Sequence, residues 1–460
     1  MKNFFRKNKK ALQICGVFFG VIFLSITTIV LVSDSYGLDF LRKLLQTTPG
    51  NSEVKKDYET LLSLAEKTLN TGGVEKTYLV LFQNNMELRP GGGFIGSFGV
   101  IKVKDGSVLD LQVHDVVNTD FKVPHSVPAP YPMEETLGVR TWSFRDSNFS
   151  PHFPENVENA LQFYKIFGGT EEFDGVIGIT THVLESMLTI TGPVSVPGYP
   201  GSYDAENGVY NLERQVEIDF VNQGIERKER KGMMRDLAVI IADKVKALPL
   251  SQKYELFKII LEDLHSKDIQ VQFLDPELQA TVERSGWAGK MDDSWQKDYF
   301  QVVDSNMNSF KSDHFIHRSY LYELDTTVTP AKARLTVTYN HTAKEKDWIV
   351  KDYQTYMRVY LPKKAFVTSV SEHVDEPRYG EFLGKKWLGT LQQIPLGTTK
   401  SVSIEYTLPT NLIGEEYDLL VERQAGIKND TAVEVRIKSS SGITQKKFFL
   451  DRTKKWSDIE

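Results

Sequence analysis

The strongest constraint on this chain is an uncharged apolar segment close to its N-terminus. Residues 11–32 (ALQICGVFFGVIFLSITTIVLV) contain no Asp, Glu, Lys or Arg. A helix of that length crosses the hydrocarbon core of a bilayer, which is about 30 Å thick. The segment is therefore predicted to be a transmembrane helix, and the lipid bilayer is the first expected partner of the chain.

Basic residues in front of this segment predict its orientation. Residues 1–10 contain no acidic residue and five basic ones, namely Lys2, Arg6, Lys7, Lys9 and Lys10. Positively charged flanks stay on the cytoplasmic side, so we expect a cytoplasmic tail and a single-pass protein with an extracytoplasmic body. The alternative is a signal peptide cleaved near Ser33-Asp34-Ser35. The apolar run is longer than the ~7–15 residues of such a peptide, so an uncleaved anchor is the prediction.

Length, charge and cysteine content limit what the exported part can be. A chain of 460 residues is expected to form two or three folded units. The net charge is -6 and the tail carries five positive charges, so the remainder carries -11. A body this acidic is not expected to bind nucleic acid. The only cysteine, Cys15, lies in the predicted membrane helix, so the exported part is expected to fold without a disulfide.

Beyond the anchor, the patterns predict a spacer followed by an α/β unit. Residues 33–75 are expected to hold a juxtamembrane spacer and an amphipathic helix over 53–69. Residues 76–320 alternate strand and helix patterns, which is typical of an α/β sandwich. Helices are predicted at 154–167, 181–190 and 211–265. Between strands and helices, 118–150 is a proline-containing loop long enough to be functional.

The strands of the α/β unit begin with a continuous apolar run. Residues 77–82 carry no charge, as expected of a buried central strand. Asp105-Gly106 joins two further strands, 98–103 and 108–113, and this dipeptide is a strong hairpin signal. Additional strands are predicted at 174–179, 269–273 and 299–303, and the last two are expected to close the unit.

Residues 321–460 are predicted to be an all-β, immunoglobulin-like sandwich. Helical patterns disappear after the predicted boundary near residue 320. Apolar and polar residues then alternate in short segments separated by turns, at 333–339, 355–360, 402–406, 417–421 and 433–437. Such alternation is typical of antiparallel strands with one buried face.

A glycine pattern after the first strand raises the question of nucleotide binding. Gly91-x-Gly93-x-x-Gly96 matches the dinucleotide fingerprint. That fingerprint requires a helix to begin at the glycines, because the helix N-terminus holds the pyrophosphate. Here the following residues continue as a strand, so nucleotide binding is not predicted.

The polar residues around these glycines leave two interpretations open. Asn84, Asn85, Glu87 and Arg89 crowd beside a glycine run that permits close backbone approach. One interpretation is a cradle for an anionic or polar ligand. The other is a structural turn in which the Glu87–Arg89 pair satisfies buried backbone groups.

Two other groups of charged residues also have both a ligand-binding and a structural interpretation. Arg227 and Arg230 belong to a basic cluster at a predicted helix start, where cations oppose the helix dipole and a phosphate would relieve the conflict. The alternative is a solvated charged face. Arg145 and Asp146 precede another helix, either as a loop-locking device or as part of a pocket.

Acidic residues after the hairpin are considered as metal ligands. Asp115 and Asp120 follow the hairpin without an evident third ligand, so no metal site is predicted. The predicted ligand-binding residues are therefore Asn84, Asn85, Glu87, Arg89, Arg145, Asp146, Arg227 and Arg230.

Several of these motifs together resemble a known bacterial family. The stretches are residues 78–97 (YLVLFQNNMELRPGGGFIGS), 145–151 (RDSNFSP), 174–177 (DGVI) and 191–194 (TGPV). They are similar, in the expected order, to the domain of unknown function 4012 family, and they cover most of residues 76–320. The resemblance implies an exported, membrane-anchored protein. It supplies no mechanism, because that family has no established activity.

A second likeness is to the LytR-CpsA-Psr glycopolymer transferases, single-pass proteins with an outward α/β domain. Arg89 before a strand looks like their first arginine motif, and Asp115 looks like the aspartate that ends their second strand pair. Residues 175–196 are similar to their strand–helix–Gly-Gly-Val segment, and Arg227 and Arg230 to their late basic motif. The resemblance implies arginines that hold a polyprenyl pyrophosphate and acidic residues that hold Mg²⁺.

Two positions depart from the transferase pattern. The acidic residue expected just after the first arginine is replaced by the glycines at 91–93. The Arg-Asp pair expected at the end of the hairpin reads His114-Asp115.

Two functional hypotheses follow, and whether the chain is an enzyme stays open between them. In the first, it is an extracytoplasmic cell-envelope protein acting as a surface binding or structural module. In the alternative, it is a LytR-CpsA-Psr-like transferase or binder of polyprenyl-pyrophosphate-linked glycopolymers. Arg89, Arg227 and Arg230 would then contact phosphates, and Asp115 would be the catalytic base or would bind Mg²⁺, the expected cofactor.

Overall fold

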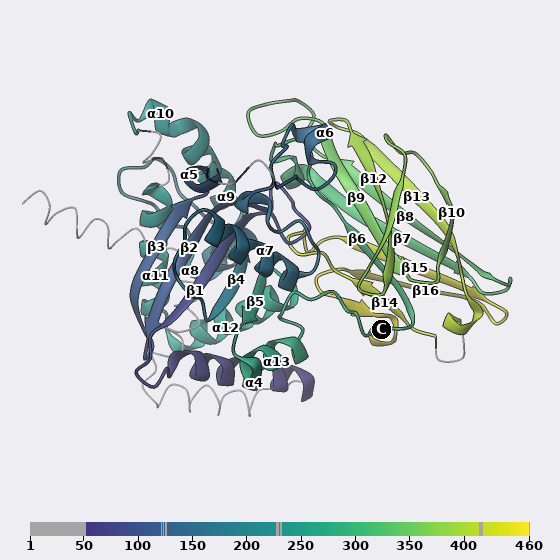
Figure 1. The fold of residues 1–460 in the computed structure, drawn as a ribbon, viewed down its shortest axis with the longest axis horizontal. Helices are drawn as coiled ribbons and strands as arrows, with labels where there is room; N and C mark the ends of the chain where they lie inside the picture. The colour runs from purple at the N-terminus through teal and green to yellow at the C-terminus, as the bar shows by residue number, and fades with distance from the viewer. Residues whose placement is uncertain are drawn as a thin grey trace, which may run out of the picture.

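The computed structural model of the chain describes residues 52–459, except 121, 123, 125–126, 227–229, 231 and 414–416. The predicted tail and membrane helix, residues 1–32, lie outside the described residues. Among the helices that are described, none combines the length and the apolar character needed to cross a bilayer. The N-terminal part is mixed α/β, and the C-terminal half consists mostly of β-sheet (Figure 1).

A mixed sheet of five strands forms the centre of the α/β unit, in the order β3-β2-β1-β4-β5. Its strands are β1 (Lys76–Asn84), β2 (Phe94–Lys104), β3 (Ser107–Asp115), β4 (Gly175–Thr180) and β5 (Ile269–Phe273). β1 runs parallel to β4, and the other neighbours are antiparallel. Asp105 and Gly106 take φ angles of 43° and 73° in the β2–β3 turn, as a two-residue hairpin loop requires.

β1 is a buried central strand, as its apolar run predicts, because helices cover both faces of the sheet (Figure 1). Tyr78, Val80 and Phe82 pack into one core, and Leu79 and Leu81 pack into the other. The helices of the first core are α4 (Ser52–Leu69), α8 (His182–Thr191), α9 (Gly208–Arg214), α11 (Gly232–Ala247), α12 (Leu250–His265) and α13 (Pro276–Arg284). The second core lies under α7 (Phe153–Ile166).

The C-terminal half contains two sheets of six strands each, in the orders β10-β13-β8-β7-β15-β16 and β11-β12-β9-β6-β14-β17. Apolar side chains from both sheets form one shared core, so the sheets face each other. The strands are β6 (Asp298–Val303), β7 (Ile316–Asp325), β8 (Ala331–His341), β9 (Tyr353–Pro362), β10 (Phe366–Val370), β11 (Arg378–Phe382), β12 (Lys385–Ile394), β13 (Thr399–Leu408), β14 (Leu419–Glu422), β15 (Ala432–Ser439), β16 (Gly442–Phe449) and β17 (Lys454–Lys455).

Two expectations for the strands are wrong. β6 was expected to close the first sheet, but it pairs with β9 and β14 in the second half. The second half was expected to be antiparallel throughout, but the β6–β14 and β7–β15 pairs are parallel. Both differences concern pairings between strands far apart in the sequence, which alternation of side chains does not encode.

The loop predicted at 118–150 begins and ends in the α/β unit and packs against the β-rich half. It contains the short helices α5 (Val117–Asp120), α6 (Met133–Leu137) and η1 (Phe144–Asp146). Met133 and Phe149 of this loop form a small core with residues of the second half, namely Met307, Tyr356 and Leu391. The loop is therefore held by burial of apolar side chains against the β-rich half.

His152, just before α7, makes a further contact at this junction and gives a test of pH dependence. Its Nδ1 accepts a hydrogen bond from the Met291 backbone N–H at 3.1 Å. Burial, together with the nearby charge of Lys290, lowers the pKa of His152 to about 4.

We expect the protein to lose stability as the pH falls from about 6.5 towards about 4. The unfolded chain keeps the usual histidine pKa, so it binds the proton first and is stabilised relative to the folded protein over this window. The contribution of His152 is fully present above the window. His152→Gln should reduce the slope of the urea midpoint against pH, and an equal slope in both proteins would contradict the assignment.

Candidate functional site

A cavity of about 170 Å³ opens where β1 and β4 end. Its inner wall is apolar, with side chains from the sheet and from α8, α9, η2 (Gln215–Asp219) and α11. These residues are Phe82, Ile179, Leu184, Val209, Leu212, Val216 and Met234. Ligands of open α/β sheets bind outside the carboxyl ends of parallel strands, where the strand order reverses. β1 and β4 form the parallel pair of this sheet, and the chain departs from them in opposite directions.

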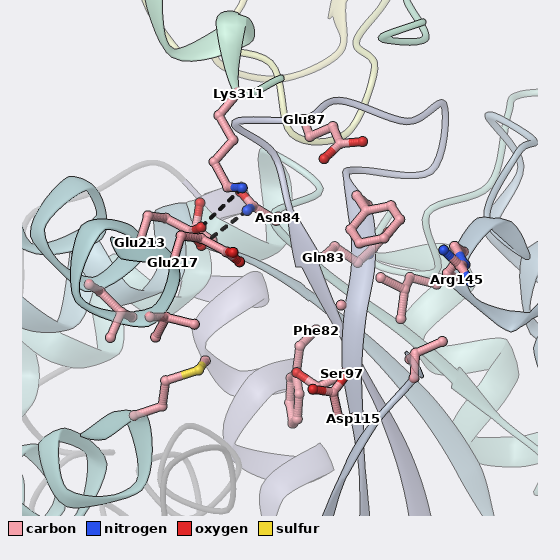
Figure 2. Close-up of a pocket in the computed structure, with 18 of the residues that line it drawn as sticks. Phe82, Gln83, Asn84, Glu87, Ser97, Asp115, Arg145, Glu213, Glu217 and Lys311 are labelled. Carbon is pink, nitrogen blue, oxygen red and sulfur yellow. Dashed lines mark hydrogen bonds and ion pairs between the residues drawn. The ribbon is translucent and has the colours of Figure 1, made fainter. Parts of the chain in front are cut away.

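One side of the opening is a cluster of paired charges. Figure 2 shows Lys311 and Asn84 both pointing toward Glu213. Lys311 Nζ lies 3.4 Å from the Glu213 carboxylate, and Asn84 Nδ2 donates to it at 3.1 Å. Burial alone would lower the pKa of Lys311, but the carboxylates of Glu213, Glu87 and Glu217 raise it. Lys311 therefore stays charged and bound to α9.

Arg230 adds a second ion pair to the lining of the cavity. Its Nη1 lies 2.7 Å from the Glu217 carboxylate and donates to the Val216 carbonyl at 3.3 Å. The predicted basic cluster therefore contributes one described cation to the cavity. Its other member among the predicted site residues, Arg227, lies outside the described residues.

Asp115 and Arg145 line the cavity on the side where β2 begins and β3 ends. Asp115 is the last residue of β3, and its Oδ1 accepts a hydrogen bond from the Val117 backbone N–H at 3.2 Å. Arg145 is ion-paired with Asp120, whose pKa is raised by burial in spite of that cation. In Figure 2, Arg145 lies apart from the Asn84, Glu213 and Lys311 group.

Arg89 and Asp146 lie behind the opening as a buried ion pair. Arg89 is only 1% exposed, and its Nε donates to Asp146 Oδ1 at 2.8 Å. A second acceptor, Glu87, lies 3.1 Å from Nη2 and also lines the cavity. Burial raises the pKa of Glu87, and Arg89 and Lys311 oppose that shift. The Arg89 guanidinium is thus occupied by groups of the protein itself.

Asn85 faces a different, polar cleft between the two halves. Its Oδ1 accepts the Thr181 backbone N–H at 3.2 Å, and its Nδ2 donates to the Gly426 carbonyl at 3.0 Å. The same amide lies 2.8 Å from Nε2 of His182. Asn85 therefore ties the end of β1 to α8 and to the second half.

The glycines of the turn approach atoms of the protein rather than leaving an open cradle. A Cβ on Gly93 would lie 2.4 Å from the Asn84 backbone, and one on Gly91 would lie 2.4 Å from the Asn156 side chain. Asn148 holds the turn, because its Nδ2 donates to the Gly93 carbonyl at 2.6 Å and its own carbonyl accepts the Gly91 N–H at 3.0 Å. After the glycines the chain continues as β2, so the helix that a dinucleotide site requires is replaced by a strand.

The cavity thus gathers five of the predicted site residues, and they are Asn84, Glu87, Asp115, Arg145 and Arg230. Arg89, Asp146 and Asn85 lie outside its lining. Among the lining residues that the sequence patterns missed are Glu213, Glu217 and Lys311. Val209, Leu212 and Val216 recur at helical spacing and could have marked a buried helix face, but nothing local links Lys311 to this place.

The fold and the cavity define a class of protein, a mixed α/β unit with a semi-enclosed apolar site, followed by a mostly β half. Residues 74–216 match the family described as "Protein of unknown function (DUF4012)". This match confirms the family resemblance over that range. No curated protein matches the chain.

Three solved structures show distant similarity. The Lin1025 protein from Listeria innocua is 12% identical, with a TM-score of 0.25, over 50% of this chain and 85% of that one. A mutant two-domain M1 zinc metallopeptidase bound to L-tryptophan is 10% identical, and one from Deinococcus radiodurans bound to a Tyr-Ser-Ala substrate is 11% identical. Each of these two has a TM-score of 0.17 and covers 29% of this chain and 39% of its own. At TM-scores this low, neither fold nor function is transferred from them.

Proposed function

We propose that the chain is a cell-envelope protein, anchored by residues 11–32, whose extracytoplasmic part is a surface binding module. The cavity at the ends of β1 and β4 accepts the apolar part of an amphipathic molecule. A likeness of the α/β unit to the LytR-CpsA-Psr fold, and of the β half to immunoglobulin-like spacer modules, belongs to the same proposal. The helix-covered sheet and the two facing sheets support it.

The observation that carries the proposal is the division of the cavity into an apolar interior and a polar opening. The interior is made by side chains such as Phe82, Ile179 and Leu212, which favour burial of hydrocarbon. At the opening, Lys311, Arg230 and Arg145 each face a carboxylate of the protein. An apolar group can enter without breaking those ion pairs.

The transferase alternative rests on the same opening. Arg145, Arg230 and Asp115 all line the cavity, so a pyrophosphate bound there would meet two guanidinium groups and an acidic residue. To bind it, Arg145 and Arg230 must give up their ion pairs with Asp120 and Glu217 and contact phosphate oxygens instead. The free energy lost with the two ion pairs is about equal to that gained from the phosphate contacts. Of the two hypotheses, the binding module therefore fits the charges better.

Photo-labelling separates the two hypotheses. Full-length protein in lipid nanodiscs is labelled with a diazirine analogue of farnesol, and the labelled peptide is mapped by mass spectrometry. Farnesol, farnesyl pyrophosphate and inorganic pyrophosphate then compete in separate arms. The binding module predicts labelling of α8, α9 or α11 and equal competition by the two farnesyl compounds. Competition that needs the pyrophosphate, and is lost in Arg145→Ala and Arg230→Ala, favours the transferase alternative.

Filling the cavity provides a second prediction. Val209→Phe is expected to reduce specific labelling at least about tenfold, because the larger side chain occupies the apolar interior. The matched control is Val221→Phe, the same substitution at a position that is 65% exposed and outside the lining. Met234→Phe repeats the test from α11 if the first variant melts early. Equal labelling of all three variants and wild type would exclude this cavity.

A further inference from the structure

A second cleft, of about 420 Å³, lies where the loop of residues 128–150 meets the face of the β-rich half. The loop and α7 supply one wall, and β9, β11 and β12 supply the other. It is separate from the cavity described above, since the two have no lining residue in common. The proline-rich loop that the sequence marked as functional is therefore a wall of this cleft.

Aromatic rings dominate the cleft, and the protein fixes their orientation. Trp142 Nε1 donates to the Asp146 carbonyl at 2.8 Å. Tyr131 donates to Asp375 at 2.6 Å, and the Arg378 guanidinium lies 3.3 Å from its ring centroid. Trp387 lies across Gly380, its partner in the β11–β12 pair, where a Cβ would come within 2.5 Å of the indole. A ring held flat against a strand presents its other face outward.

Forked polar side chains stand among these rings. Glu155 and Asn159 are one turn apart on α7 and so share a helix face. Arg358 on β9 donates through Nη2 to the Phe149 carbonyl at 3.0 Å. Its Nε is buried and finds no acceptor in the described part of the chain. Because Nε is enclosed beside the Phe149 and Tyr360 rings, an acceptor in the cleft reaches it after a shift of the Arg358 side chain.

The charges that line the cleft balance. Arg358 and Arg378 are the cations and Glu155 and Glu381 are the anions among the described lining residues. An anionic ligand would meet as many carboxylates as guanidinium groups, so electrostatic complementarity favours a neutral one. A purely hydrocarbon ligand would leave Arg358 Nε without an acceptor and would remove the Glu155 carboxylate from water.

We propose that this cleft is a binding site for a neutral saccharide. The apolar faces of pyranose rings pack against flat aromatic side chains such as Trp387. Their vicinal hydroxyl groups match the carboxylate of Glu155, the amide oxygen of Asn159 and the unmatched Nε of Arg358. The Asn159 amide is held in place, because its Nδ2 donates to the Ser147 carbonyl at 3.4 Å. Because both halves of the molecule supply the walls, a bound saccharide bridges them. This site is independent of the function proposed above.

The test uses full-length protein in lipid nanodiscs, free of sugar detergents. Chitotetraose and maltotetraose are titrated in separate arms, with decaproline in a third because proline-rich helices also dock on aromatic grooves. Binding is followed by tryptophan fluorescence and calorimetry. We expect saturable binding of a saccharide and at least about tenfold weaker binding by Trp387→Ala and by Glu155→Gln.

Tyr379→Ala is the matched control, because Tyr379 is an exposed aromatic residue on β11 outside the lining. It should bind like the wild type. If the melting curve of Trp387→Ala shows that this variant has not folded, the saccharide affinity of Glu155→Gln alone serves as the test. The inference is overturned if neither saccharide binds, if both variants bind as tightly as the wild type, or if decaproline alone binds.

Discussion

Replacing Arg89 with alanine is expected to lower the free energy of unfolding by about 3–5 kcal/mol, the cost of leaving buried carboxylates without their cation. Arg89 Nε donates to Asp146 at 2.8 Å, and Nη2 lies 3.1 Å from Glu87. Nη1 donates to the carbonyl of Asn306 in the second half at 3.0 Å. The measurement is urea unfolding of the full-length protein, followed by tryptophan fluorescence.

Two variants make this result specific. Arg89→Lys should also be strongly destabilised, because an ammonium group cannot reproduce the forked contacts of a guanidinium. Arg334→Ala on β8, which breaks an exposed pair with Glu405 of β13, should stay within about 1 kcal/mol of the wild type. If Arg89→Ala were as stable as the wild type, the buried ion pair would not stabilise the turn. Arg89 would then again be a candidate ligand-binding residue.

Arg89 shows that neighbouring residues in the sequence do not determine which polar side chains face the cavity. Asn84, Glu87, Arg89 and Arg145 look alike in the sequence, as polar residues beside glycines or before a helix. The structure turns Arg145 into the cavity and Arg89 away from it. The difference depends on partners more than fifty positions away, which no motif around Arg89 contains.

Elements with a strong local pattern were predictable, and their long-range pairing was not. The apolar run at 77–82 predicted a buried strand, and Asp105-Gly106 predicted its neighbouring hairpin. The strand at 298–303 is also entirely buried, although it contains Asp298 and Gln301. Its pattern indicates burial on both faces but does not say which sheet provides it, and β9 and β14 are its partners.

The second large loss of stability is expected at Gly426, which contacts the glycine-rich turn at Gly92. Gly426→Ala is expected to be more destabilising than Gly384→Ala, although both glycines have left-handed backbone, with φ angles of 79° and 71°. A Cβ at position 384 meets nothing within 4 Å, so this variant measures the backbone cost alone, about 1–2 kcal/mol. A Cβ at position 426 would lie 2.0 Å from the Gly92 carbonyl oxygen, which adds about 1–3 kcal/mol of overpacking.

The comparison tests whether the turn of the α/β unit and the loop of the β half form one joint. Gly426 also accepts the Asn85 side-chain hydrogen bond at 3.0 Å, so displacing its backbone weakens a second contact between the halves. Urea unfolding of both variants measures the difference. If Gly426→Ala and Gly384→Ala lost the same free energy of unfolding, the two halves would be able to move apart at this contact without a loss of stability. A larger loss in Gly426→Ala would explain why glycines stand where a ligand cradle was expected: they let two backbones touch.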